Sequence, residues 1–468
     1  MEKSQFKVII VGGSIAGLTL AHCLRQANIS HIVIEKRGNI SPQEGASVGL
    51  WPNGLQILQQ LGLYEDLERL TEPLQTLHVS YPDGFSFTSP FPRSIHERRF
   101  GYPIVFLDRQ KILQVLHERY PDKSNIHVNT KATEIRPSDN GISVVTDDGT
   151  VYHGDLVVGA DGVHSKVRSE MWRLSDESSP GSISQDEKKN MTVVFACVFG
   201  ISSQIDGLVS GEHTVNNLDG LTILTFHGKS GRVFWFVIKK LDQTYTYPNA
   251  PRFSTDDAAL LCGQLGNVRV WKDVCIKDIW KNREVVSMTA LEEGFFQTWH
   301  CDRIVLMGDS VHKMTVNIGQ GANTAIEDAA VLSSLINRLI NSHSVKKPSN
   351  EQITRLLREY QTARYTRVKQ IYDRSRLAVR FQARDGFLKA AFGRYIVPYI
   401  GNLADRPSQL VADGEVIDFL PRPERSGPGW VDFSSRGRSG LRIMVYSVVV
   451  LLLYVVFWMD LPSYMHNV

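Results

Sequence analysis

The sequence contains few cysteines and arranges them without a pattern. Five cysteines (Cys23, Cys197, Cys262, Cys275 and Cys301) are scattered over 468 residues, and no two of them have CxxC spacing. An odd number without paired spacing is typical of free thiols in a reducing compartment and not of a disulfide framework. None has the neighbouring His or Cys residues that a structural zinc site needs, so we expect no metal site.

A concentrated charge of either sign is also absent. The 52 Lys and Arg residues nearly balance the 49 Asp and Glu residues, which leaves a net charge of +3. Without a basic stretch, nucleic acid is not expected as a partner. The segment Met1–Lys7 lacks the basic and apolar regions of a secretory signal peptide, so none is expected. The chain length suits two or three domains with a large core.

One long hydrophobic run is present, near the C-terminus. Between Ile443 and Met459 there is no charged residue, and only Ser447 lacks a bulky apolar or aromatic side chain. At the helical rise per residue this run covers roughly 26 Å, close to the ~30 Å hydrocarbon core of a bilayer. We therefore predict a transmembrane helix over residues 441–460. The alternative is a buried core strand or helix at the end of the domain.

Basic residues precede this hydrophobic run. Arg436, Arg438 and Arg442 lie just before it. The first two belong to a segment over 421–440 that is rich in Pro, Arg, Gly and Ser and that we interpret as a flexible linker. The positive-inside rule places these arginines, and the chain before them, on the cytosolic side. We thus expect a membrane protein with a single C-terminal anchor, in the endoplasmic reticulum, whose catalytic part faces the cytosol.

The N-terminal segment has the pattern of a βαβ unit. An apolar strand over Val8–Val11 leads into a glycine-rich turn, followed by an amphipathic helix over about Ile15–Ala27 and a second strand over Ser30–Glu35. This order and length are those with which a Rossmann-type domain begins.

The turn of this unit has the residues of a dinucleotide site. Gly12, Gly13 and Gly17 allow backbone amides to approach a pyrophosphate at the N-terminus of the helix. Glu35, at the end of the second strand, is placed to bind ribose hydroxyls. Ser14 occupies the middle glycine position of the G-x-G-x-x-G pattern, which makes the match formally incomplete.

A second stretch, DLVVGADGVHSKVR, places Asp161 and Gly162 directly after an apolar strand over Asp155–Gly159, with Arg168 following. Taken alone, an Asp–Gly pair marks a strand-ending turn. A third stretch, RIVLMGDSVHKMTVNIGQGANTAIEDA, has a strand over Arg303–Met307 that ends in Gly308–Asp309.

The third stretch continues into a glycine loop and a helix. Gly319 and Gly321 precede a helix that begins near Ala322. A carboxylate at a strand end suits ribityl hydroxyls, and a Gly–Gln–Gly turn that opens a helix suits charge developing on a flavin pyrimidine. The three stretches together predict an α/β fold in which a Rossmann-like dinucleotide-binding domain is assembled from separated segments.

A second predicted sheet, which lacks the glycine turns of the first, is inserted into this domain. Strands are predicted over Thr192–Gly200, Leu221–Phe226 and Val233–Lys239, after a polar linker over 175–190. Helical patterns cover Gly54–Arg69, Arg109–Tyr120 and Glu351–Arg384. We predict the cofactor domain over 1–180 and 291–345, an inserted β-sheet substrate domain over 181–290, and a C-terminal helical region over 346–420.

With these motifs, residues 5–420 resemble the FAD-dependent aromatic-hydroxylase-type (group A) monooxygenases, whose cofactor domain is of the glutathione-reductase type. The resemblance implies that Glu35 binds the FAD ribose, that Asp309 binds the ribityl chain and that Arg109 contacts FAD. It also implies that Asp161–Gly162 serves both FAD and NADPH. The cofactor-binding residues expected on these grounds are Gly12, Gly13, Gly17, Glu35, Gly49, Arg109, Asp161, Asp309, Gly321 and Ala322.

The likeness is closer to one branch of that family. The stretches GGSIAGLTLAHCL, GASVGLWPNG, GDSVHKMTVNIGQGANTAIEDA and DFLPRPER are similar to those of fungal FAD epoxidases of meroterpenoid and indole-diterpene biosynthesis. Val316 stands where that branch has proline, so the loop beneath the flavin lacks a fixed φ.

The resemblance implies a monooxygenase with bound FAD and with NADPH and O2 as co-substrates. We expect epoxidation of a prenyl double bond in a lipophilic terpenoid or meroterpenoid intermediate of secondary metabolism. The alternatives are hydroxylation of a phenolic ring, prenyl-chain reduction on the same fold, and a non-catalytic prenyl-protein escort module. The membrane-spanning prediction favours a lipophilic substrate.

Oxygen transfer of this kind requires no strong protein nucleophile, so no catalytic triad is expected. His312 and His213 are the candidates for a catalytic role in proton transfer, with His227 as a third. A structural role is the alternative for each. Four aromatic residues of the second sheet either line an apolar pocket for a prenyl chain or pack in the core: Phe226, Phe234, Trp235 and Phe236.

Overall fold

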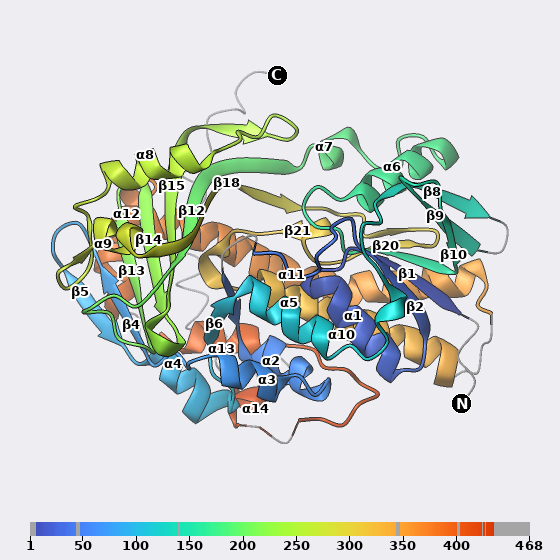
Figure 1. Ribbon diagram of the computed structural model, residues 1–468, viewed down its shortest axis with the longest axis horizontal. Helices are drawn as coiled ribbons and strands as arrows, with labels where there is room; N and C mark the ends of the chain where they lie inside the picture. The colour runs from blue at the N-terminus through green and yellow to red at the C-terminus, as the bar shows by residue number, and fades with distance from the viewer. Residues whose placement is uncertain are drawn as a thin grey trace.

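A computed structural model of the chain describes residues 6–43, 47–138, 141–342, 347–399, 403–423, 425 and 427–434. Two large sheets lie side by side, with helices packed between and around them (Figure 1). The elements of the first sheet come from three separated parts of the chain, as the three glycine motifs predict.

The first sheet has six strands in the order β19-β20-β11-β1-β2-β7, and all neighbours except β19 and β20 are parallel. Its central strands are apolar and buried, which is typical of a parallel sheet covered on both faces. Their bounds are β1 (Lys7–Val11), β2 (Ser30–Ile34), β7 (Ile126–His127), β11 (Leu156–Gly159), β19 (His300–Cys301) and β20 (Ile304–Leu306).

Helices α1 (Ile15–Gln26) and α10 (Gly321–Asn337) pack against each other, and α1 also packs against β1 and β2 of the first sheet. Nearly every residue of α10 is buried, because α2 (Pro52–Gln60) and the long α11 (Asn350–Gln382) also pack against it. The same half of the molecule also contains three further helices, a strand pair and a small sheet: α3 (Tyr64–Leu70), α5 (Arg109–Glu118), α6 (Lys166–Ser178), the pair β3 (Ser47–Leu50) and β6 (Val105–Asp108), and the sheet of β8 (Ala132–Ser138), β9 (Gly141–Thr146) and β10 (Val151–Gly154).

The second sheet has eight strands in the order β21-β18-β12-β15-β14-β13-β4-β5. Along β15 the side chains alternate between two cores, with Phe234 and Phe236 on one face and Trp235 on the other. The strands are β4 (Thr76–Ser80), β5 (Ser86–Ser89), β12 (Met191–Ser202), β13 (Glu212–Leu218), β14 (Leu221–His227), β15 (Val233–Thr246), β18 (Arg283–Phe295) and β21 (His312–Lys313).

The outer face of the second sheet is covered by α8 (Thr255–Gln264), α9 (Ile276–Lys281) and the pair β16 (Arg269–Trp271) and β17 (Val274–Cys275). At the far edge lie α4 (Phe91–Arg93) and the π-helical turn η1 (Ser94–Phe100). The three predicted strands of this sheet are confirmed in β12, β14 and β15. The sheet also takes in β4 and β5, which precede the predicted substrate domain, because β4 pairs in parallel with β13.

Two local predictions were wrong. The helix expected over Gly54–Arg69 is two helices, α2 and α3, separated at Gly62, whose φ of 72° lies in the left-handed region that ends a helix. The polar linker expected over 175–190 contains the end of α6 and the short helix α7 (Gln185–Lys188). Glu187 of α7 is buried and accepts hydrogen bonds from the backbone amides of Gln297 and Thr298.

The C-terminal region is helical, with α11, α12 (Phe387–Tyr395), α13 (Asp405–Ala412) and α14 (Gly429–Asp432). Part of the predicted flexible linker is packed, since Trp430 of α14 donates through Nε1 to the carbonyl of Phe100 at 3.1 Å. The hydrophobic run Ile443–Met459 lies outside the described residues. Within the described part of the chain, no helix is both long and apolar enough to cross a membrane.

Candidate functional site

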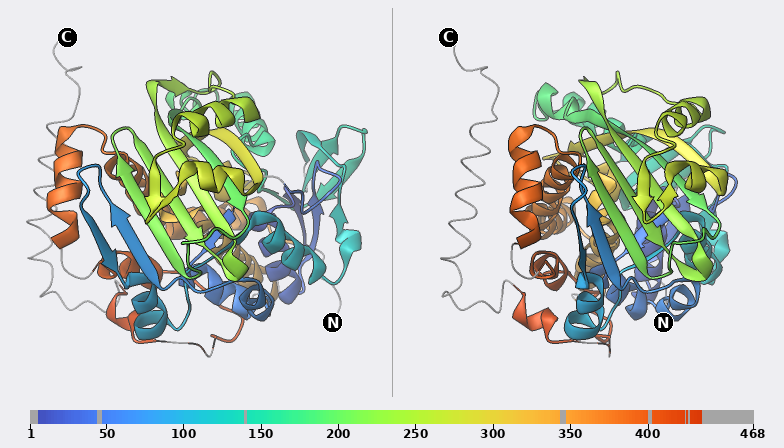
Figure 2. Two further views of the ribbon diagram at one scale, coloured as in Figure 1. Left: turned by 60° about the vertical axis from the view of Figure 1, so that its left-hand side comes forward. Right: turned by 90° about the vertical axis from the view of Figure 1, so that its left-hand side faces the viewer.

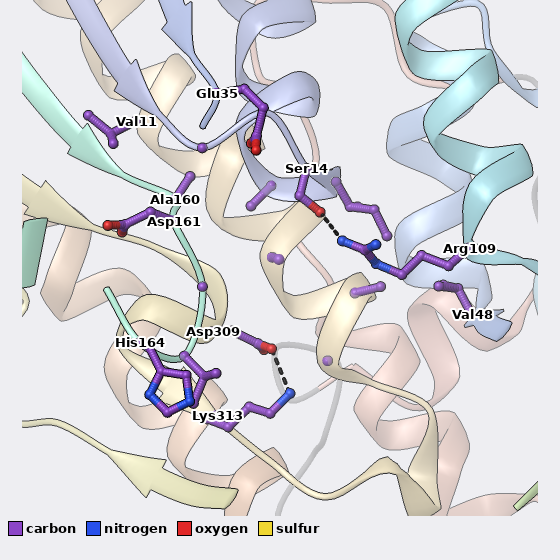
Figure 3. A pocket seen from close by; sticks show the side chains of 18 of the residues that line it. Val11, Ser14, Glu35, Val48, Arg109, Ala160, Asp161, His164, Asp309 and Lys313 are labelled. Atoms are coloured by element: carbon purple, nitrogen blue, oxygen red, sulfur yellow. Dashed lines mark hydrogen bonds and ion pairs between the residues drawn. The ribbon is translucent and has the colours of Figure 1, made fainter. Parts of the chain in front are cut away.

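A cavity of about 830 Å³ opens at the carboxyl ends of β1, β11 and the strand that leads to Asp309. This is where open α/β sheets bind ligands. Figure 3 shows side chains from all three glycine motifs directed into it. Of the ten expected cofactor-binding residues, Gly12, Glu35, Gly49, Arg109, Asp161, Asp309, Gly321 and Ala322 line the cavity, whereas Gly13 and Gly17 do not.

The first glycine turn is tight enough to exclude any side chain at two positions. Gly12 has φ of 112°, and a Cβ atom there would lie 2.3 Å from the carbonyl oxygen of Ala160. At Gly17 a Cβ atom would lie 1.9 Å from the carbonyl oxygen of Gly12. Gly17 therefore acts from outside the cavity, by letting α1 approach the turn and direct its N-terminus toward the cavity.

Gly13 also acts indirectly, by holding Glu35. Its backbone amide donates to Oε2 of Glu35 at 2.8 Å, and the amide of Arg37 donates to Oε1 at 2.9 Å. The carboxylate is buried at the end of β2 and lines the cavity. Each oxygen retains a lone pair for a hydroxyl of a bound ligand.

Ser14, the departure from the glycine pattern, makes a contact of its own. Its Oγ accepts a hydrogen bond from Nη2 of Arg109 at 2.8 Å (Figure 3). The serine thereby holds a guanidinium group beside the turn, where a pyrophosphate would need positive charge. Sequence reasoning missed this pair because the residues are 95 positions apart.

We expect Ser14→Ala and Arg109→Met each to weaken FAD binding, and the double variant to lose less than the sum. The hydrogen bond to a charged group couples the two residues by about 1.5–3 kcal/mol. Titration of the apoprotein with FAD, followed by flavin fluorescence, measures all four affinities. Additive losses would show that the serine does not position the arginine.

The second motif caps a helix and joins the third motif. Asp161 accepts from Oγ of Ser165 at 2.5 Å and from the amide of Lys166 at 2.7 Å, which fixes the start of α6. Arg168 donates through Nη1 to the carbonyl of Ser310 at 2.7 Å and through Nη2 to that of Val163. Burial lowers the pKa of Arg168 to about 10, so it stays charged at neutral pH.

In the third motif, Asp309 has a partner that the sequence analysis did not consider. Nζ of Lys313 donates to its Oδ2 at 2.7 Å, and both side chains line the cavity (Figure 3). Lys313 follows Asp309 by four residues, and this spacing of opposite charges was a signal in the sequence for the ion pair. The pair places one positive charge beside the carboxylate expected to bind hydroxyls.

The loop that follows is held without proline. Val316 starts a short 3-10 turn over Val316–Ile318 and lines the cavity. Thr315 hydrogen bonds to Ser375 of α11, and Nδ2 of Asn317 donates to Oε1 of Gln382 at 2.5 Å. These contacts to α11 supply the restraint that a proline ring would otherwise give.

Asn323 joins this loop to the strand on the other side of the cavity. Its Nδ2 donates to the carbonyls of Gly49 at 3.0 Å and Gly319 at 2.8 Å, and its Oδ1 accepts from the amide of Trp51. Sequence reasoning missed this residue, since nothing in the local pattern separates it from an ordinary helical polar residue. Gly49 and Gly319 thus face the cavity at fixed positions.

The structure places both catalytic histidine candidates outside the cavity. His312 is fully buried, and its Nε2 lies 2.6 Å from Oδ2 of Asp328, which also accepts the amide of Gly308. Its role there is to hold the turn before Asp309. His213 is buried in β13, where its ring stacks on Phe226 with centroids 5.3 Å apart. Neither placement supports proton transfer to a ligand in the cavity.

His227 and His213 instead make the protein sensitive to acid. Burial, reinforced by neighbouring histidines, lowers the pKa of His213 to about 3 and of His227 to about 4. Below the ordinary histidine pKa of about 6.5, the unfolded chain binds protons that the folded chain does not. The free energy of unfolding is therefore expected to fall by up to about 1.4 kcal/mol per pH unit for each histidine as pH drops from 6.5 to about 4.

The variant His213→Phe is expected to have about half of this histidine-dependent slope. Urea unfolding at pH 7 and pH 5 measures the slope for both proteins. An unchanged slope in the variant would show that His213 is not the group that titrates on unfolding.

Aromatic side chains form the wall of the cavity that faces the second sheet. Phe106 and Phe236 line it together with Met314 and Val316. Of the four aromatic residues predicted from the sequence, only Phe236 reaches the cavity. Phe226 stacks behind Phe106 with centroids 3.7 Å apart, Trp235 faces the outer core, and Phe234 borders a separate cavity of about 310 Å³.

Comparison with known proteins agrees with this geometry. The model of the "FAD binding domain" family matches residues 5–375. The FAD-dependent monooxygenase nvfK of Aspergillus novofumigatus is 56% identical over 467 residues, 99% of each chain. The FAD-dependent monooxygenase penE of Penicillium thymicola is 59% identical over 440 residues, 94% of this chain and 92% of its own.

Solved structures share the fold at low identity. HpxO of Klebsiella pneumoniae, complexed with FAD and uric acid, superposes with a TM-score of 0.67 at 20% identity, over 84% of this chain and 93% of its own. CtdE, in complex with FAD and a substrate, gives a TM-score of 0.63 at 19% identity, over 82% and 92%.

Proposed function

This chain belongs to the FAD binding domain family and is an FAD-dependent monooxygenase, and we propose that it epoxidises a prenyl double bond of a water-insoluble prenylated substrate. The observation that carries this proposal is the cavity itself. One end has the glycine turn and carboxylates that suit FAD, and the other has the apolar wall of Phe106, Phe236, Met314 and Val316.

The residues present fit FAD in a specific order along the cavity. We propose that the pyrophosphate binds at the turn of Gly12 and the N-terminus of α1, beside Arg109. We propose that Glu35 binds the ribose hydroxyls and Asp309 the ribityl hydroxyls. The N-terminus of α10, at Gly321 and Ala322, then lies at the flavin ring, beside Gly49.

When bound, FAD supplies electron transfer from the nicotinamide co-substrate and activation of O2. The protein holds the substrate and excludes water. The amides at the start of α10 favour negative charge that develops on the ring, and Lys313 adds a positive charge nearby. No ionisable side chain is needed to attack the alkene, which agrees with the apolar side chains at this end.

We further propose NADPH as the electron donor, docking transiently at Asp161–Gly162. The described residues contain one βαβ opening with a glycine turn, and we assign the cavity beside it to FAD. The closer likeness to fungal epoxidases of meroterpenoid and indole-diterpene biosynthesis supports the prenyl substrate. The hydrophobic run Ile443–Met459 supports a C-terminal membrane anchor, with the catalytic part on the cytosolic face of the endoplasmic reticulum.

The test is a product assay with the purified, FAD-loaded full chain. With a farnesylated aromatic acid as substrate, we expect NADPH oxidation and O2 uptake to rise together and the product to gain one oxygen atom. A simple phenol is the matched control and should give neither. Oxygen gain on the phenol alone would favour ring hydroxylation, and flavin turnover without O2 uptake would contradict oxygen transfer.

A further inference from the structure

The outward side of α12 and the short turn η7 (Val397–Tyr399) carries large exposed hydrophobic side chains. Phe387 is 84% exposed, Tyr395 65% and Tyr399 69%, and Leu388 and Ile396 are also exposed. The other exposed large hydrophobic side chains among the described residues are far apart in the sequence: Val128, Val151, Val209, Leu260 and Val431. Clustered exposed apolar residues mark an interaction surface. We call these five residues the α12 face.

The inner side of α12 is firmly packed, so the α12 face is a fixed surface. The ring of Phe392 lies 5.4 Å from that of Phe381 on α11. Oη of Tyr81 donates to the carbonyl of Gly393 at 2.6 Å. Nε of Arg394 donates to Asp83 at 2.7 Å. The outward residues are therefore presented by a helix that cannot turn to bury them.

The composition of this segment suits a lipid headgroup region. From Phe387 to Tyr399 it combines aromatic and aliphatic side chains with the basic residue Lys389, and it has no acidic residue. The second basic residue, Arg394, is paired with Asp83 on the inner side. Tyrosine and phenylalanine beside basic residues are typical of helices that lie in a membrane interface. The nine residues of α12 are too few to span a bilayer.

The position of the C-terminal elements brings this surface next to the proposed anchor. Figure 2 (right) shows α12, α13 and α14 along one edge of the molecule. Val431 of α14 is also exposed. The hydrophobic run that begins at Ile443 follows the last described residue, Ser434, by fewer than ten positions. An anchor that starts so close holds this edge near the bilayer.

We propose that the α12 face lies in the headgroup region of the membrane and docks the catalytic body on it. This inference rests on the proposed C-terminal anchor and goes beyond it, because it assigns a second contact and an orientation. Docking would bring the cavity close to the lipid. Gln382, at the end of α11, holds Asn317 of the loop whose neighbour Val316 lines the cavity. A lipophilic substrate would then reach this loop from the bilayer.

The test uses the full chain in vesicles of phosphatidylcholine and phosphatidylserine. A bimane fluorophore is attached to Phe387→Cys and, as the matched control, to Leu260→Cys on α8, which is exposed on the opposite edge (Figure 2). The unmodified chain, labelled in parallel, corrects for native cysteines. We expect nitroxide-bearing lipids to quench most of the fluorescence at position 387 and little at 260, and aqueous iodide to do the reverse.

Other occupants give different results, each of which overturns the proposal. Shielding from iodide without lipid quenching would mean that the protein's own C-terminal segment covers the surface. The same pattern appearing only at high protein-to-lipid ratio would mean a second copy of the chain. Iodide quenching at both positions would mean a free surface.

Carbonate extraction of the same vesicles separates this proposal from the anchor and from the enzymatic function. If the protein stays in the membrane but lipids do not quench the fluorophore at position 387, the C-terminal anchor is supported and the docking of the α12 face is contradicted. Lipid quenching without retention would support the docking and contradict the anchor. Bound FAD and NADPH oxidation, measured in detergent, report the function independently. The variant Phe387→Ser/Tyr395→Ser/Tyr399→Ser should keep its bound FAD and its NADPH oxidation in detergent. It should lose activity on substrate dissolved in vesicles.

Discussion

Gly12→Ala is expected to weaken FAD binding so much that the purified protein is colourless. The left-handed φ of 112° strains any other residue, and the added Cβ would lie 2.3 Å from the Ala160 carbonyl oxygen and 2.9 Å from Cα of Asp161. Both of these atoms belong to the second glycine motif, so the turn and the Asp161 loop must separate. Strain of about 1–3 kcal/mol, added to the clash, corresponds to at least about 100-fold weaker binding.

Gly62→Ala is the matched control. Gly62 also has a left-handed φ, of 72°, but no atom lies within 4 Å of its added Cβ, and it lies between α2 and α3. This variant should lose some stability and remain yellow. The flavin content of both purified proteins, measured by absorbance after heat release, decides the result. Full FAD content in Gly12→Ala would contradict the assignment of the pyrophosphate to this turn.

Arg364→Met is expected to cost about 3–5 kcal/mol of the free energy of unfolding, the range for removing one partner of a buried ion pair. Arg364 is fully buried on α11 and donates to Glu327 at 2.6 Å and to Asp328 at 2.8 Å, both on α10. Burial alone would raise the pKa of Asp328, but the interactions with His312 and Arg364 outweigh it and lower this pKa to about 2. Without Arg364, two carboxylates remain buried beneath the turn at Gly308.

Arg338→Met provides the comparison on an exposed pair. Arg338 is half exposed and pairs with Glu359 at 3.0 Å and Asp418 at 3.1 Å. Exposed pairs of this kind contribute about 0–1 kcal/mol. Urea unfolding of both variants at neutral pH measures the difference. Equal losses would show that the buried cluster does not hold α10 and α11 together.

The parts of the fold with a local pattern were predictable from the sequence. The βαβ opening, the three strands of the second sheet and the start of α10 each have a continuous periodicity or a glycine turn. The pairing of β4 with β13 was not predictable, because a parallel pair between distant segments leaves no local signal. Gly62 did offer a signal for the break between α2 and α3 that the helical periodicity around it obscured.

The candidate site likewise contains residues that a local sequence pattern predicts and contacts that no local pattern predicts. The turn at Gly12, the acid Glu35 and the strand end at Asp309 follow from spacing. The bonds from Arg109 to Ser14 and from Asn323 to Gly49 join residues 95 and 274 positions apart, so no local pattern could indicate them. The burial of His312 was not predictable for a related reason. Its partner Asp328 is one helix away, and only the packed structure shows that the pair is buried.

In the proposed reaction the enzyme moves one oxygen atom of O2 onto a prenyl double bond. Incubation of the FAD-loaded full chain with NADPH, a farnesylated aromatic acid and ¹⁸O2 tests it most directly. We expect a product that contains one ¹⁸O atom in an oxirane on the prenyl chain, located by fragmentation in the mass spectrometer. A label on the aromatic ring, or a product whose oxygen comes from water, would contradict it.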